Sequence, residues 1–187
     1  LGDVYKRQRE LWVVKAQMLM ALDRHAEAVD YLNRAMALKD ENNDPLSEIF
    51  CTATAGITYM GVDTISTRAE SAFRRACRVA ERSGLSNYWL YPQAIGRLAD
   101  IYLQQGKYEE SISLCREAIR LCEKSGSYHG KLVVAEILTE AYRLLGLYDE
   151  AFRYCAVGTG EPARAEVDNN LIGRFFIAKA EIHNNLN

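Results

Sequence analysis

The apolar side chains of this chain recur at intervals of three and four residues. Tyr108, Ile112 and Cys115 are followed at this spacing by Ile119 and Cys122, so the five side chains fall on one side of a helix. Similar apolar stripes alternate with short polar breaks along most of the sequence. The pattern therefore predicts helices over residues 10–22, 26–38, 45–60, 66–83, 88–105, 108–124, 130–145, 148–158 and 166–184.

Residues at the ends of these stripes match the chemistry of helix ends. Gly84 and Gly126 each follow an apolar stripe, where glycine forms the left-handed cap that ends many helices. Asp44 precedes Pro45, which pairs a capping carboxylate with the proline favoured in the first helical turn. Both signals support the predicted boundaries.

The helical pattern repeats about every 40 residues. Tyr102 and Gly106 return 40 positions later as Tyr142 and Gly146, and neighbouring residues repeat with the same shift. A fixed period in this range is typical of proteins built from stacked repeats. Each copy contains two helices separated by a tight break, so we predict helical hairpins. The copies span residues 9–42, 45–85, 88–127 and 129–162, and half of a fifth copy spans residues 165–187.

Small residues occupy the positions where the two helices of a hairpin must approach each other. Interaxial distances of ~8–10 Å depend on such residues, because a larger side chain would force the helix axes apart. We therefore predict close helix contacts at Ala16, Gly56, Ala99 and Thr139 on first helices, and at Ala28, Ala69, Ser111 and Ala151 on second helices.

Composition predicts a soluble protein with a cytoplasmic location. Apolar residues make up 49% of the chain and charged residues 26%, and no apolar run approaches the ~20 residues that span a bilayer. No secretory signal pattern is present either. The five cysteines are an odd number without CxxC spacing, so we interpret them as buried small hydrophobes in a reducing compartment.

The charge balance argues against a nucleic-acid or membrane partner. The net charge is −2 and the sequence pI is about 6.0, so the whole chain has no electrostatic attraction to phosphate-rich surfaces. Arg75, Arg78 and Arg82 do share one helical face, which is a possible phosphate or acidic-partner surface. We interpret this stripe as a solvated face, because Glu81 lies beside it.

The sequence contains none of the common catalytic signatures GxSxG, HExxH, phosphate loop or kinase set. Gly158-Thr-Gly160 is the nearest approach to a glycine-rich loop, but it follows a predicted helix, so we interpret it as a helix stop before a linker. His25, His129 and His183 lie in different repeats without a ligand-spaced partner. We therefore predict no enzyme activity, no cofactor and no metal site.

The first eight residues, Leu1 to Gln8, resemble the translated sequencing adapter found at the ends of metagenomic gene fragments. We interpret residues 1–8 as a non-native leader that does not belong to the natural fold. Residues 9–187 are then a single solenoid domain.

The repeat residues resemble those of a known family. The spaced pattern over residues 10–187 resembles that of tetratricopeptide repeat proteins. The 40–42-residue repeat is longer than the family's usual ~34 residues and is similar to the long variant in bacterial regulators and signalling proteins. The resemblance implies an all-α fold, a right-handed α-α superhelix of about four hairpins plus a partial fifth. The residues that carry it are Trp12, Ala16, Glu27, Ala28, Leu32, Ala35, Leu98, Ala99, Tyr102, Gly106, Tyr108, Ser111 and Ala118.

This resemblance also implies where a partner binds. In such proteins the first helix of each hairpin lines a concave groove that takes a peptide or a partner helix. Asp100, Glu136 and Glu140 would favour a basic segment, and the end near Met20 and Ile57 would take apolar side chains. The positions that match the chaperone-binding carboxylate clamp hold no lysine, arginine or asparagine, which argues against a co-chaperone role. The candidate groove residues are Val13, Gln17, Met20, Ala53, Ile57, Met60, Gly96, Asp100, Leu103, Glu136, Glu140, Arg143, Ile177 and Glu181.

The leading hypothesis is a non-catalytic module that binds a protein or peptide, as the sensory or scaffold part of a bacterial regulatory protein. One alternative is a helical ligand-processing enzyme in which Glu136 and Glu140, one helical turn apart, share a proton. That alternative requires a deep enclosed pocket, and an open trough would argue against it. The other alternative is self-association through the apolar side chains of the last repeat, Leu171, Phe175, Phe176 and Ile177.

Overall fold

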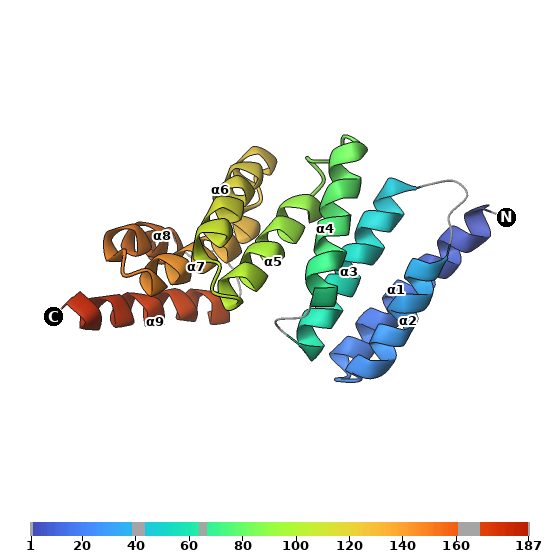
Figure 1. Cartoon of the computed structure of the whole chain (residues 1–187), viewed down its shortest axis with the longest axis horizontal. Coiled ribbons are helices and arrows are strands. Elements are labelled where there is room, and N and C mark those ends of the chain that lie inside the picture. Colours follow the sequence, from blue (N-terminus) through green and yellow to red (C-terminus); the bar gives the residue numbers. More distant parts are fainter. Residues whose placement is uncertain (1, 39–43, 64–66, 161–168, 187) are drawn as a thin grey trace. The chain divides into compact units, whose positions relative to one another are not determined.

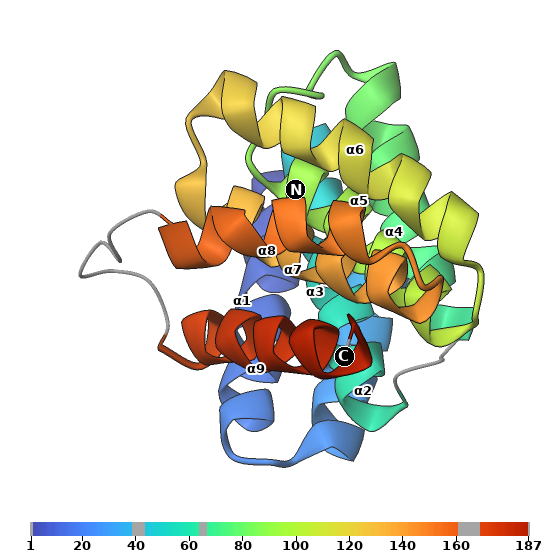
Figure 2. The ribbon, with the colours of Figure 1, turned by 90° about the vertical axis from the view of Figure 1, so that its left-hand side faces the viewer.

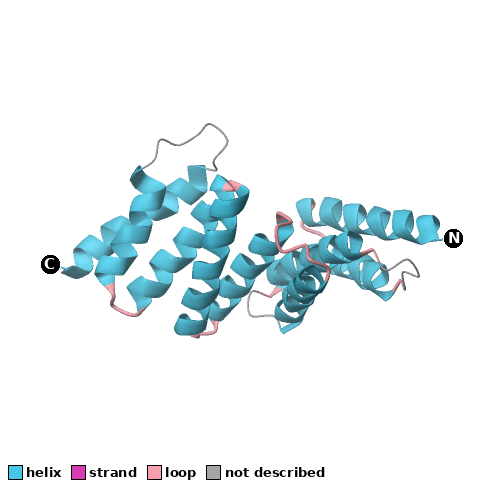
Figure 3. Ribbon diagram, turned by 90° about the horizontal axis from the view of Figure 1, so that it is seen from above, coloured by secondary structure: helices cyan, strands magenta, loops and turns pink. Residues whose placement is uncertain are grey.

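A computed structural model describes residues 2–38, 44–63, 67–160 and 169–186, and every regular element in these ranges is an α-helix (Figures 1 and 3). Each predicted helix is present, with ends that differ from the prediction by a few residues except at the first helix. The helices are α1 (Gly2–Ala21), α2 (His25–Ala37), α3 (Pro45–Val62), α4 (Thr67–Arg82), α5 (Leu90–Gln104), α6 (Tyr108–Ser125), α7 (Tyr128–Leu144), α8 (Tyr148–Gly160) and α9 (Asn169–Leu186).

Helix α1 begins at Gly2, well before residue 10, where the sequence pattern placed its start. The proposed leader, residues 1–8, therefore lies almost wholly within this helix. A foreign segment can extend a helix as readily as a native one, so helical conformation does not distinguish them and the leader stays a prediction. Arg9, the first residue after it, is buried and donates a hydrogen bond of 2.7 Å from Nη2 to the carbonyl of Leu38.

The chain divides into two compact units, Leu1–Arg97 and Leu98–Asn187, and the dividing line falls within α5. In the first unit, α1 pairs with α2 and α3 pairs with α4 as helical hairpins, and α3 also packs against α1 and α2 (Figure 1). Val13, Leu32, Ile49 and Phe73 are fully buried between these helices.

In the second unit, α7 is the central helix. It packs against α6, α8 and α9, and α8 also packs against α9 (Figure 2). The core shared by α7, α8 and α9 contains Leu132, Ala135, Cys155, Leu171 and Phe175. Helix α9 is therefore anchored to α7 and α8 by its own apolar side chains.

The tight turns of the first, third and fourth hairpins share one backbone conformation. At the turn after α5, the Lys107 amide donates to the Tyr102 carbonyl (2.9 Å) and Gly106 adopts a left-handed φ of 75°. The turn after α7 repeats this arrangement at Gly146, whose φ is 72°. These bonds form a glycine-capped helix end. Gly84 and Gly126, where the sequence predicted such caps, are also left-handed, with φ 67° and 69°. In the first hairpin, Asp23 occupies the same place with φ 60°.

A tyrosine hydroxyl links successive hairpins at equivalent positions in both units, as a donor in one and as an acceptor in the other. The Tyr59 hydroxyl on α3 donates to Asn33 Oδ1 on α2 at 2.7 Å. In the second unit, Arg116 Nη2 on α6 donates to the Tyr142 hydroxyl on α7, also at 2.7 Å. Both partners are shifted by 83 positions, which is the spacing of two repeats, so the sequence repeat is also a repeat of contacts.

The small residues are buried as predicted. Ala16, Ala28, Ala99 and Ser111 have no exposed surface, and Ser111 Oγ donates to the Ala99 carbonyl at 2.7 Å across the third hairpin. Gly56 on α3 lies directly against the ring of Phe73 on α4, where an added Cβ would sit 2.7 Å from the nearest ring atom. The packing of α3 on α4 therefore depends on the missing side chain at this position.

Helix α8 ends at Gly160, within the predicted stop Gly158-Thr-Gly160. Gly158 also has a packing role, because an added Cβ there would collide with the ring of Phe175 on α9. The glycine therefore permits a close approach of two helices. The linker predicted after this stop lies outside the described residues.

We predict that Gly56→Ala lowers the free energy of unfolding by about 1–3 kcal/mol, because Phe73 is fully buried and has no room to move away. Gly173→Ala is the matched control: it is also within a helix, but an added Cβ there meets no atom within 4 Å. This control should leave stability unchanged or raise it by up to ~1 kcal/mol through helix propensity. Urea unfolding measures both, and equal effects would contradict the packing argument.

We also predict that Asp23→Gly raises stability by up to about 1 kcal/mol, because glycine adopts a left-handed φ without the steric cost borne by other residues. The contact of Asp23 Oδ1 with His25 Nε2, at 2.7 Å, is lost in this variant, but it lies at the surface and contributes little. The reverse exchange, Gly106→Asp, should destabilise. Thermal unfolding of the two variants, compared with wild type, tests this; shifts of the same sign would refute it.

Candidate functional site

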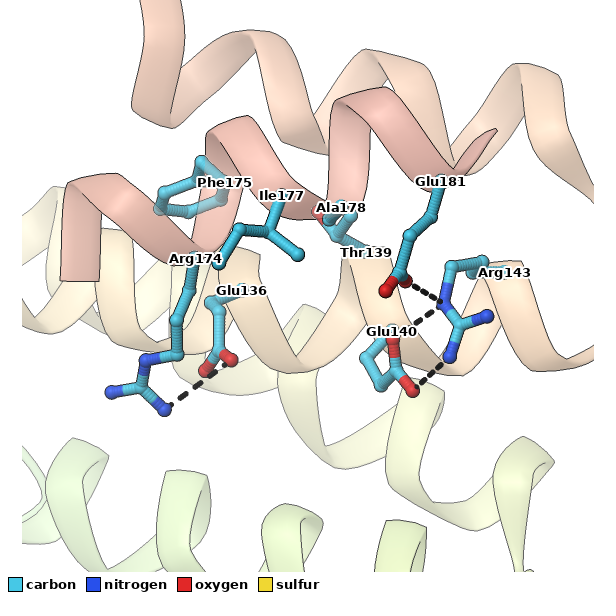
Figure 4. A pocket seen from close by; sticks show the side chains of 9 residues that line it. All are labelled: Glu136, Thr139, Glu140, Arg143, Arg174, Phe175, Ile177, Ala178 and Glu181. Atoms are coloured by element: carbon cyan, nitrogen blue, oxygen red, sulfur yellow. Dashed lines mark hydrogen bonds and ion pairs between the residues drawn. The ribbon is translucent and has the colours of Figure 1, made fainter. Parts of the chain in front are cut away.

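An open pocket lies between α7 and α9 in the second unit (Figure 4). Its volume is about 260 Å³, comparable to one or two amino-acid side chains. The pocket is open to solvent on one side, since the side chains of Glu181 and Arg174 are 50% and 59% exposed. The residues that line it are Glu136, Thr139, Glu140 and Arg143 from α7, and Arg174, Phe175, Ile177, Ala178 and Glu181 from α9.

One end of this pocket carries a three-residue charge network. The Arg143 guanidinium donates to both carboxylate oxygens of Glu140, at 2.6 and 2.7 Å, and lies 3.5 Å from the Glu181 carboxylate on α9 (Figure 4). Hydrogen bonding to Glu140 raises the pKa of Arg143, and the negative charge of Glu181 contributes in the same direction. One cation therefore serves two carboxylates.

At the other end, Arg174 Nη1 on α9 lies 3.4 Å from Glu136 Oε1 on α7. Ile177 and Ala178 lie on α9 between this ion pair and the Arg143 network (Figure 4). The lining has three carboxylates and two guanidiniums, so its formal charge is −1. The pocket is therefore less acidic than the sequence prediction, which considered the carboxylates Glu136 and Glu140 without Arg174.

This geometry does not favour the enzyme alternative. Glu136 and Glu140 each face a different arginine, at 3.4 and 2.6 Å, so they are not placed as a pair that shares one proton. The pocket is also an open trough rather than the enclosed cavity that such chemistry needs. Binding is the chemistry that this arrangement can support.

Five predicted groove residues meet in this pocket, although they come from two repeats: Glu136, Glu140, Arg143, Ile177 and Glu181. The other predictions have mixed surroundings. Gln17 and Ile57 are exposed, and Met20, Met60 and Asp100 are half-buried. Four are buried and have no surface to offer a partner in this conformation: Val13, Ala53, Gly96 and Leu103.

Met20 was predicted as a groove residue, but its side chain packs against its neighbours within the protein. Its sulfur lies 3.2 Å from His25 Nδ1, and its methyl group lies against Gly61 on α3. The Met20 side chain therefore packs between the first hairpin and helix α3. His25 therefore packs at the turn of the first hairpin.

Four residues that line the pocket were not predicted as groove residues: Thr139, Arg174, Phe175 and Ala178. Arg174, Ala178 and Glu181 step by four and three along α9, so their shared face could have been read from helical spacing. What spacing could not give was the pairing of Arg174 with Glu136, 38 residues earlier. The self-association set is also divided, since Leu171 and Phe175 are buried and Phe176 and Ile177 are 55% and 60% exposed.

The arginine stripe on α4 is only partly the solvated face that we inferred. Arg75 Nη2 makes a 2.7 Å ion pair with Glu48 on the neighbouring helix α3. Near the start of α5, Tyr91 is buried and its hydroxyl donates to Glu81 at 3.0 Å, whereas Trp89 is 51% exposed. Tyr91 therefore packs in the protein interior, whereas Trp89 lies largely at the surface.

A second pocket, in the first unit, lies between α2, α3 and the start of α4. Its volume is about 580 Å³, and His25, Tyr59 and Arg68 are among its lining residues. The Tyr59 hydroxyl is hydrogen-bonded to Asn33, and both ring nitrogens of His25 contact other side chains. Its polar groups are therefore largely engaged within the protein.

Within the described residues, no group of three or more His, Cys, Asp or Glu side chains is placed to hold a metal ion. None of the described helices is long and apolar enough to cross a membrane. All five cysteines are buried, as predicted, and none forms a disulfide.

Tetratricopeptide repeat family models match residues 10–42 and residues 91–154. Together these matches cover slightly more than half of the chain and fall on both units. The chain belongs to the tetratricopeptide repeat family. No curated protein matches the sequence.

Solved structures with the same fold cover nearly the whole chain. A signal transduction ATPase with numerous domains and a tetratricopeptide repeat sensor, from Pyrococcus horikoshii, is 19% identical with a TM-score of 0.73; the match covers 94% of this chain but only 26% of that one. BtubC from P. vanneervenii is 14% identical with a TM-score of 0.73, over 98% of this chain and 84% of that one. A kinesin-light-chain-like protein with TPR-like repeats, from Podospora anserina, is 17% identical with a TM-score of 0.71, over 95% and 88%. The all-α TPR-like fold predicted from the sequence is confirmed.

We predict that stability declines at alkaline pH because of the buried cysteines. Burial raises the pKa of the Cys51 thiol to about 11, and the partial opposing effect comes from Arg9 and Arg75. In the unfolded chain a thiol ionises near 8.5, so the unfolded state loses its proton first. Stability should be complete below about pH 8 and fall as the pH rises from there towards 11. Urea unfolding at a series of pH values tests this; a slope unchanged in Cys51→Ala would contradict the role of this thiol.

Proposed function

We propose that this chain is a non-catalytic module that binds a protein or peptide segment through the pocket between α7 and α9. The observation that carries the proposal is the meeting of Glu136, Glu140, Arg143, Ile177 and Glu181, from two successive repeats, in one open pocket. Helical spacing in the sequence alone predicts each of these positions for the groove. A pocket of about 260 Å³ fits side chains of a partner better than a drug-sized ligand.

The partner we propose has a basic segment. Glu140 and Glu181 share Arg143, and Glu181 remains half exposed at 3.5 Å from it, so an incoming lysine or arginine could contact this carboxylate. The net charge of −1 in the lining favours that approach over an acidic one. Ile177, which is 60% exposed, offers an apolar surface beside it.

We further propose a sensory or scaffold role within a larger bacterial regulatory protein in the cytoplasm. The likeness to the Pyrococcus horikoshii protein, whose repeats are described as a sensor, supports this role by analogy of fold. The chain spans about a quarter of that protein, so the analogy concerns the sensor part alone.

The test is selection of peptides from a displayed random library against residues 1–187, followed by calorimetric titration of the selected peptides. We predict that enriched peptides carry lysine or arginine and bind Glu140→Lys at least ~10-fold more weakly, which corresponds to about 1.4 kcal/mol. Glu27→Lys is the matched control, because Glu27 pairs with Arg24 at the same helical spacing in the other unit.

Peptides that bind wild type and Glu140→Lys equally would show that this pocket is not the binding site. A library that yields no peptide above background would overturn the peptide-binding proposal itself. Circular dichroism of each variant confirms that the helices are retained.

A further inference from the structure

The turn between α7 and α8 exposes three leucines within four residues. Leu144, Leu145 and Leu147 are 44%, 39% and 50% exposed, and Gly146 lies among them. Single exposed leucines are ordinary on protein surfaces, but a cluster of this kind is a feature of interaction sites. We call these three side chains the leucine turn.

The fold does not require leucines at this turn. The turn between α5 and α6 has the same backbone conformation. The φ angle is 75° at Gly106 and 72° at Gly146. In each turn, two equivalent amide-to-carbonyl hydrogen bonds measure 2.9 and 3.0 Å. Its sequence is Gln104-Gln105-Gly106-Lys107, so polar side chains satisfy the same geometry. The apolar character of the leucine turn therefore needs a reason other than folding.

The leucine turn continues one face of the pocket between α7 and α9. Glu136, Glu140 and Leu144 follow each other at intervals of four along α7, so Leu144 lies one helical turn beyond the pocket carboxylate Glu140. Arg143, the shared cation of the pocket, directly precedes it. An apolar surface and a charged pocket are thus adjacent at the same end of α7.

Carboxylates border this apolar surface. Asp149 is exposed in the first turn of α8, and the side chain of Glu150 beside it is 40% exposed and paired with Arg153 at 3.1 Å. On the pocket side, the half-exposed Glu181 lies next to Arg143. This border repels an anionic lipid surface and attracts a basic partner.

We infer that the leucine turn is the apolar half of one docking surface, and that the partner is an amphipathic basic helix. Its apolar side chains contact Leu144, Leu145 and Leu147, while a lysine or arginine enters the pocket between α7 and α9. Since Glu140 and Leu144 are one helical turn, ~5.4 Å, apart, the basic and apolar residues of the partner are three or four positions apart on its helix. This inference rests on the proposed function and specifies the partner of that site.

The test transfers the polar turn of the third repeat to the fourth, in the variant Leu144→Gln, Leu145→Gln, Leu147→Lys. The variant should keep its thermal midpoint, because the same side chains already occupy an equivalent turn. A matched control, Leu11→Gln with Met18→Lys, removes two side chains that are 62% and 64% exposed on α1. Both are titrated with the peptides selected against wild type.

We expect the turn variant to bind these peptides ~10-fold more weakly and the control to bind them as wild type does. Selection repeated against the turn variant should enrich basic peptides without apolar residues three or four positions away. Weakened binding in both the turn variant and Glu140→Lys supports the inference together with the proposed function.

The outcomes separate the two ideas. If the turn variant binds fully and Glu140→Lys binds more weakly, the inference is overturned and the proposed function stands. If both variants bind fully, the inference and the proposed function are both overturned. Sedimentation that shows a wild-type dimer and a monomeric turn variant identifies a second copy of this chain as the occupant, which also overturns the inference. Flotation of wild type, but not of the turn variant, with vesicles of phosphatidylcholine and phosphatidylserine would overturn it in favour of a lipid surface.

Discussion

Close approach of neighbouring helices at positions without a bulky side chain is the constraint on which the rest of this structure depends. At Gly158 the ring of Phe175 lies directly on the backbone of α8. That contact anchors α9 against the core that it shares with α7 and α8. Phe175 also lines the pocket, and its packing holds α9 where Arg174, Ile177 and Glu181 lie opposite α7.

The turns impose a second and more local constraint. A left-handed residue ends the first helix of a hairpin, and the following amide returns to the helix to satisfy one of its last carbonyls. Once this backbone is fixed, the side chains around the glycine are free to vary. At this turn the third repeat has two glutamines and a lysine, and the fourth repeat has the leucine turn.

Helices, hairpins and buried small residues were predictable because they depend on patterns within one repeat. Apolar spacing located the helices, and glycine chemistry located the turn at Gly106 and the cap at Gly126. The candidate site was predictable only in part. Five of the predicted groove positions line one pocket, yet Val13 and Ala53 are buried, because spacing alone does not say how deeply the neighbouring hairpin covers a helix face.

The amino-acid sequence by itself determined the family, the repeat and the positions that can lie on an inner helix face, since each of these follows from periodic chemistry along the chain. Tertiary structure decided which charges pair. Glu136 meets Arg174, and Glu140 shares Arg143 with Glu181, only after α9 has packed on α7. It also decided that Gly158 lies against Phe175, because a glycine in sequence carries no record of the ring that will lie against it.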